Sequence, residues 1–437
     1  MGKWYLAPLA IAVHIYALNR SDKKALSILA FAAAFNAFLL HWTSIYVGST
    51  PWVVLVVGLS ILYLPLLLVK RWGIAAYPLL FVIAEEIRNR FPFGGFGWGR
   101  LAYSQADAPY AKIAYYGGAI SLSSITALVG LALFQLGRQK LNLKPLIPLL
   151  LLLLPINVVS NIQTNVLMVQ GNVPQYGLDF NSRATEVFFN HVKETDKALK
   201  ENPNIDFILW PENAVDVDPF KNSNVNSELN KYKKPLIIGA IVDSNGKTFN
   251  NSILWSKNGY KSYSKQHLTP FGEYIPLRSL ARNISPLVDQ VDDFSAGNQF
   301  TIFTIGKAKV APVICYELID DSILEKAAKG SNILAVQTNS ATFGRSAESA
   351  QQLSITRVRA IEHSRNIVSV STTGYSAIIN YKGEILQKTS MGTAEHISAN
   401  VGLIQSDSPR DRLGDWAMIF TLIWLLLVSR RAYVLRR

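Results

Sequence analysis

The sequence predicts a polytopic α-helical membrane domain of about seven spans joined to an α/β domain. Hydrophobic residues make up 49% of the 437 residues, more than a soluble globular chain usually carries. They are concentrated in residues 1–162 and near the C-terminus, whereas residues 163–408 have an ordinary globular composition. We therefore expect about six spans within 1–162, the α/β domain within 163–408, and a last span with a basic cytoplasmic tail within 409–437.

The predicted spans are apolar segments, several of which are followed by clusters of Lys and Arg. A spanning helix needs roughly 20 apolar residues, so the first and fourth segments are short for a span. Because basic residues collect on the cytoplasmic side, their positions put the N-terminus and residues 163–408 outside. A cleaved signal peptide is not expected, since further spans follow directly. The segments are 4–18, 26–47, 52–69, 74–87, 117–136, 145–159 and 416–428.

The net charge of +13 does not indicate nucleic-acid binding. The basic clusters abut the apolar segments, and membrane topology explains them without a basic and aromatic binding face. A single cysteine excludes an intrachain disulfide, so cysteine usage does not report the compartment.

The fourth apolar segment ends in ionisable residues, among them Glu86, and a run of Gly and aromatic residues that ends at Trp98 follows it. Ionisable groups at membrane depth are costly unless they are paired or hydrated, which favours a functional role. The alternative is that these Glu and Arg side chains pair with each other at the headgroup boundary. Both interpretations stay open at this point.

Short apolar runs in residues 163–408 predict strands, and amphipathic patterns between several of them predict helices. This alternation is typical of a layered α/β domain. The strands are predicted at 166–171, 205–210, 236–242, 251–255, 261–265, 310–314, 333–337, 367–371 and 377–381, and the helices at 181–199, 323–328 and 347–363.

Cys315 follows the apolar strand at 310–314, at the edge of an α/β sheet where ligands commonly bind. A thiol in this position suits a nucleophile, although an isolated cysteine is more often a small buried hydrophobe. Glu212 and Lys265 also come at strand ends, where they offer a base and a cation to a nucleophile. Taken singly, each is explained as well by an exposed turn residue.

Three motifs together change this balance. Trp210-Pro-Glu212, the stretch 265–273 (KQHLTPFGE) and Ile314-Cys-Tyr-Glu317 occur in this order between the membrane segments. They resemble the Glu, Lys and Cys signatures of the nitrilase (carbon–nitrogen hydrolase) superfamily, in its apolipoprotein N-acyltransferase branch. The resemblance extends over nearly the whole chain, through the stretches 169–174, 357–362, 96–98 and 103–105.

The resemblance implies an α-β-β-α sandwich and a triad of Glu212 as general base, Lys265 as the cation at the oxyanion and Cys315 as nucleophile. It also implies supporting roles for Glu273 and Glu317, which would orient Lys265 and the incoming amine, and for Tyr316 beside the nucleophile. The alternatives for these residues are ion pairing, packing and anchoring of a loop. His267 is not expected to be catalytic, because no Asn or Asp partner is apparent in the sequence.

The chain departs from the family pattern at two places. The family's Asn-Asp-x-Trp-Phe-Gly stretch reads NSATFG at 339–344, which lacks the acid and the tryptophan. The tryptophan often found after the Gln-Gly-Asn-x-Pro motif is absent, and Phe180 is the nearest aromatic. The residues expected to contact substrate are Phe180, Glu86, Trp98, Asn339 and Phe343.

The implied enzyme is a multi-pass protein of the bacterial cytoplasmic membrane, expected as a monomer. It would move an acyl chain from a phospholipid, through a cysteine thioester, to the α-amino group of apolipoproteins. No metal cluster or phosphate-binding loop is visible, so no cofactor is expected. The alternatives are a membrane-anchored amidase with the same triad, and a transporter or scaffold without activity.

Overall fold

The computed structural model describes residues 2–139, 144–173, 175–177 and 185–434. The chain folds into two compact units, each with its own hydrophobic core. The first unit comprises Met1–Ser44, Gly48–Ile156 and Ser408–Arg437, and the second comprises Ile45–Val47 and Asn157–Asp407.

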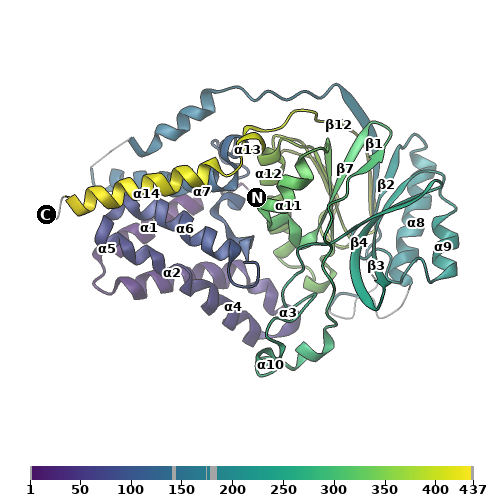
Figure 1. Cartoon of the computed structure of the whole chain (residues 1–437), viewed down its shortest axis with the longest axis horizontal. Helices are drawn as coiled ribbons and strands as arrows, with labels where there is room; N and C mark the ends of the chain where they lie inside the picture. Colours follow the sequence, from purple (N-terminus) through teal and green to yellow (C-terminus); the bar gives the residue numbers. More distant parts are fainter. Residues whose placement is uncertain (1, 140–143, 174, 178–184, 435–437) are drawn as a thin grey trace. The chain divides into compact units, whose positions relative to one another are not determined.

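The first unit is built from helices, most of them apolar (Figure 1). Its core includes Ile11 and Ile15 from one helix and Phe81 from another, all fully buried. Within the longest helix the chain bends at Gly118, whose φ of +70° a side chain would disfavour. The helices are α1 (Leu6–Arg20), α2 (Lys24–Leu39), α4 (Ser49–Ile61), α5 (Val69–Trp72), α6 (Tyr77–Arg90), α7 (Ile113–Gly137), α13 (Pro409–Leu413) and α14 (Trp416–Val434). Of the short helix α3 (Ser44–Val47), only Ser44 belongs to the first unit.

Two helical stretches among the described residues are long and apolar enough to cross a membrane: Ser49–Trp72, which includes α4 and α5, and Ile113–Gly137. Lys24–Leu39 and Trp416–Arg430 are apolar but shorter. The prediction of seven spans is therefore not confirmed. The span predicted at 145–159 is likewise not confirmed: the 3₁₀ helix Lys144–Leu153 lies there with Pro148 inside it, and proline removes a helical N–H donor.

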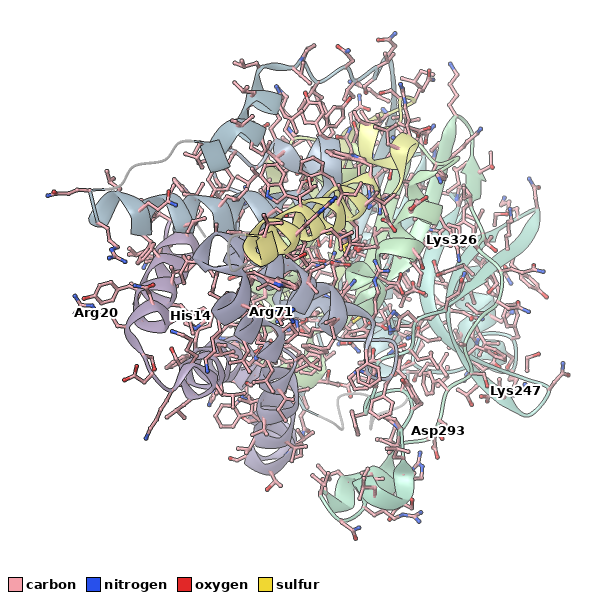
Figure 2. All side chains as sticks on the ribbon, turned by 60° about the vertical axis from the view of Figure 1, so that its left-hand side comes forward. His14, Arg20, Arg71, Lys247, Asp293 and Lys326 are labelled. Atoms are coloured by element: carbon pink, nitrogen blue, oxygen red, sulfur yellow. The ribbon has the colours of Figure 1, made fainter. Side chains whose placement is uncertain are left out.

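Several buried polar residues of the first unit are paired inside it. The backbone N–H of Leu101 donates to Glu85, and Arg88 Nη1 donates to the Tyr63 hydroxyl, each at 2.7 Å. Glu86 forms ion pairs with Arg90 and Arg100. Of the two interpretations of this segment, the contacts favour structural pairing. Figure 2 labels further polar side chains of α1 and α5, namely His14, Arg20 and Arg71.

The second unit contains two six-stranded sheets. The order in one is β12-β1-β2-β3-β4-β5, and in the other β11-β10-β9-β8-β7-β6. Parallel pairing is confined to β1-β2-β3 and β7-β8-β9. The strands are β1 (Ile162–Gln170), β2 (Phe207–Leu209), β3 (Leu236–Ser244), β4 (Lys247–Ser256), β5 (Gly259–Ser264), β6 (Phe303–Ile305), β7 (Ala308–Ile314), β8 (Ile333–Thr338), β9 (Ile367–Ser371), β10 (Ala377–Ile379), β11 (Ile385–Lys388) and β12 (Glu395–Leu403).

The sheets pack face to face because alternate residues of a strand point to opposite sides. Val166 and Met168 of β1 belong to the core between the sheets, whereas Leu167 and Val169 belong to the core under the helices. Helices α8 and α9 cover one sheet, and α11 and α12 cover the other (Figure 1). This gives an α-β-β-α sandwich. The helices are α8 (Glu186–Glu201), α9 (Ser223–Leu229), α10 (Arg278–Ala281), α11 (Asp321–Ala328) and α12 (Glu348–His363).

Most predicted strands lie within one or two residues of the observed ones, but β11 and β12 were not predicted, and β6 was not predicted as a separate strand. β12 pairs with β1 along its whole length, from Leu403 opposite Ile162 to Glu395 opposite Gln170. The loop between β5 and β6 carries α10 and is held by an ion pair between Arg278 and Asp293. Figure 2 labels Asp293.

Candidate active site

The strand-end residues predicted from the sequence lie at three strand ends of the second unit. Cys315 directly follows β7, Lys265 directly follows β5, and Glu212 comes three residues after β2 ends at Leu209. The Cys315 backbone has a φ of +49°, a left-handed conformation that a side chain of this kind rarely adopts. Such strain at a polar strand edge is common at functional sites. The Glu212 carboxyl group and the Cys315 thiol are close enough to shift each other's pKa, so the structure brings the predicted base near the predicted nucleophile.

Lys265 is a buried cation between two carboxylates. Its Nζ lies 2.7 Å from Glu273 Oε2 and 3.4 Å from Glu212 Oε1, and only 1% of its side chain is exposed. The backbone N–H of Thr269 also donates to Glu273 Oε2, at 2.7 Å. Glu273 thus forms an ion pair with Lys265, which agrees with the orienting role that the resemblance implies; that role stays a prediction.

Asn250 of β4 was not predicted, yet it joins the two carboxylates. Its Nδ2 donates to Glu212 Oε1 and to Glu273 Oε1, both at 2.8 Å. A side-chain amide with two donor hydrogens can hold both acids in a fixed relation. The signal was available, because two polar residues at 250–251 interrupt an otherwise strand-like pattern.

Glu317 is fully buried and anchors the turn after β7. Its Oε2 accepts from the Ile314 backbone N–H at 2.8 Å. Its Oε1 accepts from the Tyr263 hydroxyl and from the backbone N–H of Gln266, both at 2.7 Å. These contacts connect the turn that carries Cys315 to the segment that carries Lys265. They favour a loop-anchoring role for Glu317 over a role in orienting the incoming amine.

The pKa values of the cluster follow from burial and from its one cation. Burial, with Glu273 nearby, raises the pKa of Glu212, and Lys265 opposes this shift. Burial and the charge of Glu212 raise the pKa of the Cys315 thiol well above its usual value, again against Lys265. Burial would lower the pKa of Lys265, but Glu273 and Glu212 raise it overall. At neutral pH the lysine is therefore charged, and the thiol needs a base to lose its proton.

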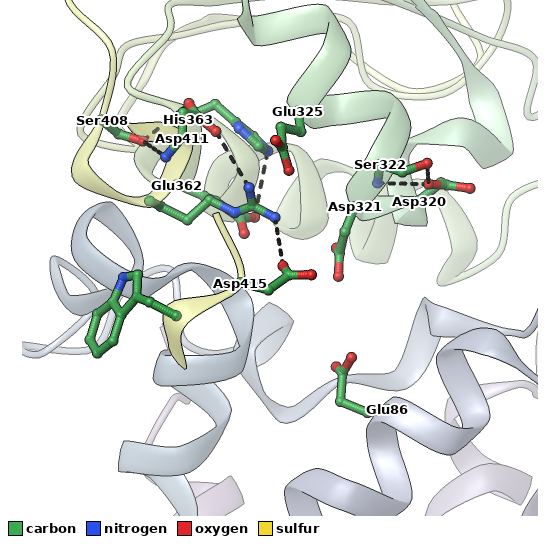
Figure 3. A network of polar contacts seen from close by, with 12 residues as sticks. Glu86, Asp320, Asp321, Ser322, Glu325, Glu362, His363, Ser408, Asp411 and Asp415 are labelled. Atoms are coloured by element: carbon green, nitrogen blue, oxygen red, sulfur yellow. Dashed lines mark hydrogen bonds and ion pairs between the residues drawn. The ribbon is translucent and has the colours of Figure 1, made fainter. Parts of the chain in front are cut away.

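His267 has an acidic partner, contrary to the sequence prediction. Its Nδ1 lies 2.7 Å from Asp320 Oδ2, and its ring packs edge-on against Tyr316 with centroids 5.2 Å apart. Asp320 also accepts from the backbone N–H of Ser322 at 2.8 Å and so caps α11 (Figure 3). The contact spans 53 positions of sequence, which is why the motif alone did not reveal it.

The residues expected to contact substrate have different surroundings. Asn339 is buried and its Oδ1 accepts from the backbone N–H of Ala341 at 3.0 Å, while Phe343 is half-buried in the following turn. Glu86 and Trp98 belong to the first unit, where both are buried. Phe180 lies outside the described residues. A substrate role for these five residues stays a prediction.

Two further side chains near the nucleophile come from α12 and were not predicted. Gln352 Nε2 lies 3.9 Å from Cys315 Sγ. The Glu348 carboxyl interacts electrostatically with Cys315 and Glu212. Within the described residues, no group of three or more His, Cys, Asp or Glu side chains is placed to hold a metal ion.

Comparison with known proteins agrees with this geometry. Residues 168–417 match the family "Carbon-nitrogen hydrolase", and residues 1–132 match "Apolipoprotein N-acyltransferase N-terminal domain". The apolipoprotein N-acyltransferase of Mycolicibacterium smegmatis is 30% identical, with 95% of this chain and 79% of that protein covered. The chain belongs to the apolipoprotein N-acyltransferase family.

Other apolipoprotein N-acyltransferases match over similar lengths. That of Geobacter metallireducens is 30% identical, with 95% of this chain and 89% of that protein covered. That of Photobacterium profundum is 27% identical, with coverages of 98% and 90%. Among solved structures, Saccharomyces cerevisiae Nit3, a member of branch 10 of the nitrilase superfamily, has a TM-score of 0.43 and 18% identity, covering 57% of this chain and 93% of Nit3.

Proposed function

We propose that this protein transfers a fatty acyl chain from a membrane phospholipid to the α-amino group of the N-terminal diacylglyceryl cysteine of apolipoproteins. The observation that carries the proposal is the buried cluster in which Lys265 lies between Glu212 and Glu273, with Glu212 close enough to the Cys315 thiol to shift its pKa. Membership of the apolipoprotein N-acyltransferase family supports it.

In the first half-reaction, Glu212 takes the proton of Cys315, and Sγ attacks the ester carbonyl carbon of the phospholipid. The carbonyl oxygen becomes an oxyanion, which the charge of Lys265 stabilises. The carbon–oxygen bond to the glycerol then breaks, and Glu212 returns the proton to the leaving lysophospholipid. A thioester on Cys315 remains.

In the second half-reaction, the neutral α-amine of the apolipoprotein attacks the thioester carbonyl. Glu212 takes a proton from the attacking nitrogen, and Lys265 again stabilises the oxyanion. The carbon–sulfur bond breaks, the amide forms, and Glu212 reprotonates the thiolate. Each residue thus returns to its starting state, and the product is a triacylated lipoprotein.

The proposal includes a membrane arrangement. The six segments in residues 1–162 and the last one in 409–437 would span the cytoplasmic membrane, with residues 163–408 on the outer face. The excess of basic residues beside these segments supports this orientation. A catalytic domain so placed meets phospholipid esters and the lipidated cysteine at the same surface. The enzyme would work as a monomer.

The alternatives differ in the second acceptor. An amidase with the same triad would pass the acyl group to water, and an inactive scaffold would form no thioester. The relatives named apolipoprotein N-acyltransferase at 25–30% identity favour acyl transfer to an amine. The release of free acid or ammonia from an amide, without an acylated peptide, would instead support the amidase.

The test is incubation of the purified protein with a phospholipid that carries a labelled acyl chain, without acceptor. Wild type should acquire label that hydroxylamine removes, because thioesters are cleaved by this nucleophile, and Cys315→Ala should acquire none. A wild-type protein without label, or a Cys315→Ala variant that retains it, contradicts the covalent mechanism. Adding a diacylated lipopeptide should then move the label to its α-amine.

A further inference from the structure

Glu348, in the first turn of α12, is a carboxyl group for which the proposed mechanism has no use. Only 2% of the residue is exposed. Ser340 lies close enough to favour the charged form of this carboxyl group, and the Oε2 atom of Glu348 has no hydrogen-bond partner among the described residues. Ser340 itself is 1% exposed, so the pair is enclosed.

The ionisable groups that interact with Glu348 are acidic. They are Glu212, beyond the end of β2, and the Cys315 thiol on the 3₁₀ helix Cys315–Ile319, against which α12 packs. Strands β9 and β10 also pack against α12 and contain no ionisable residue. On α11, Asp321 pairs with Arg359, farther along α12.

An ionised Glu348 would therefore be a buried anion close to a site with a single cation. Lys265 already lies beside two carboxylates, Glu212 and Glu273. The oxyanion of each half-reaction adds another negative charge next to Cys315. A further anion there would oppose both this oxyanion and the thiolate. The N-terminus of α12 favours the anion only weakly compared with the cost of burying an unpaired charge.

The protonation equilibrium agrees with this geometry. Burial raises the pKa of Glu348 to about 8, with the charge of Glu212 acting in the same direction and Ser340 opposing both. The carboxyl group is therefore neutral at pH 7, and it ionises just above. Ser340, beside Glu348, occupies the position of the aspartate in the family's Asn-Asp-x-Trp-Phe-Gly stretch. In this chain Glu348 of α12 therefore provides a carboxyl group close to that position.

We propose that Glu348 is a positioning residue of the acyl-transfer site that must remain protonated, and that its ionisation turns the Cys315 nucleophile off. The inference rests on the proposed function and deepens it, because the ionisation of Glu348 would set the pH above which the acyl transfer slows. Glu348 acts through the charge it presents to Cys315 and its oxyanion. Gln is the matched substitution, because it has the same shape and stays neutral at every pH.

The experiment is the pH dependence of thioester formation in the full-length protein, with labelled phospholipid and no acceptor. Leaving out the amine matters, because an α-amine titrates near pH 8 and would obscure the result. In wild type the initial rate should fall above pH 8, approaching tenfold for each further pH unit. Glu348→Gln should keep a measurable rate at pH 7 that does not fall between pH 8 and 9.

A second variant, Ser340→Ala, tests the same proposal even if Glu348→Gln does not fold. Ser340→Ala removes the hydroxyl group that favours the anion, so its alkaline fall should move to higher pH than in wild type. Glu362→Gln is the control, since this carboxyl lies on the same helix and pairs with Arg359. It should keep the wild-type fall. Thermal unfolding of each variant shows whether it is folded.

The outcomes separate the two proposals. A wild-type protein that forms no thioester at any pH contradicts the proposed function. Thioester formation without a fall up to pH 9, or with the same fall in Glu348→Gln and an unmoved one in Ser340→Ala, overturns the role of Glu348 alone. A folded Glu348→Gln variant with no thioester at any pH also overturns it, because a neutral side chain would then not suffice.

Discussion

At the scale of single residues, the nucleophile depends on a neighbour that is not a member of the triad. Cys315 has a φ of +49°, a backbone conformation that costs about 1–3 kcal/mol and persists only where the surroundings enforce it. Glu317 supplies that enforcement, because its two oxygens bond the backbone before Cys315 and the segment after Lys265. We infer that Glu317 acts mainly by holding this turn.

Glu317→Gln tests this inference. An amide offers one acceptor oxygen where the carboxylate offers two, so at least one buried donor, such as the Ile314 N–H, loses its partner. The free energy of unfolding should fall by about 1–3 kcal/mol, and thioester formation should fall with it. Thermal unfolding in detergent and label incorporation measure the two effects.

The control for this variant is Glu228→Gln, which removes a surface ion pair with Lys231 and should leave both measurements nearly unchanged. Full stability of Glu317→Gln combined with complete loss of activity would contradict the anchoring role. Glu317 would then act on the reacting groups themselves.

At the scale of elements, the position of Glu212 depends on a glycine in the neighbouring strand. Gly239 of β3 faces the chain just after β2, and a Cβ atom built on it would lie 2.6 Å from Glu212 Cα and in contact with Pro211 O. Both neighbours are backbone atoms, which cannot rotate away. Only glycine lets the segment that carries the predicted base lie this close to β3.

Gly239→Ala should therefore displace Glu212 from Cys315 and Asn250. Overpacking of this kind costs about 1–3 kcal/mol of stability, but a base displaced by about 1 Å can cost about a hundredfold in rate. The rate of thioester formation should thus fall far more than the melting temperature. Gly137→Ala is the control, because a Cβ there meets no atom within 4 Å. A Gly239→Ala variant with wild-type activity would contradict this account of the strand contact.

The triad positions were predictable because each polar residue follows a local apolar run. Cys315 and Lys265 lie directly after the strands that the pattern predicted. Contacts between distant parts of the chain were not predictable in this way. Asn250 lies 38 residues from Glu212, and its role depends on how β4 pairs within the sheet. β12 was missed because its partly exposed edge position gives no continuous apolar run.

At the scale of the whole molecule, the positions of the Lys and Arg clusters predict on which side of the membrane each segment lies. The two long apolar helices alone do not determine this. Lys23 lies between α1 and α2, Lys24 begins α2, and Lys70 and Arg71 lie in α5. If basic clusters mark the cytoplasmic side, these segments lie inside and residues 163–408 lie outside. Lys and Arg residues near the ends of the spans have the largest effect on the orientation of a membrane protein.

The single cysteine makes this orientation measurable. In a Cys315→Ala background, Asn258→Cys and Lys23→Cys each place one thiol at an exposed position, the first in the β4–β5 turn and the second before α2. A membrane-impermeant thiol reagent applied to intact spheroplasts should label the Asn258→Cys protein directly. It should label the Lys23→Cys protein only after the membrane is permeabilised.

Labelling of Lys23→Cys from outside, or protection of Asn258→Cys, would reverse the proposed orientation. The phospholipid would then have to reach Cys315 from the cytoplasmic side.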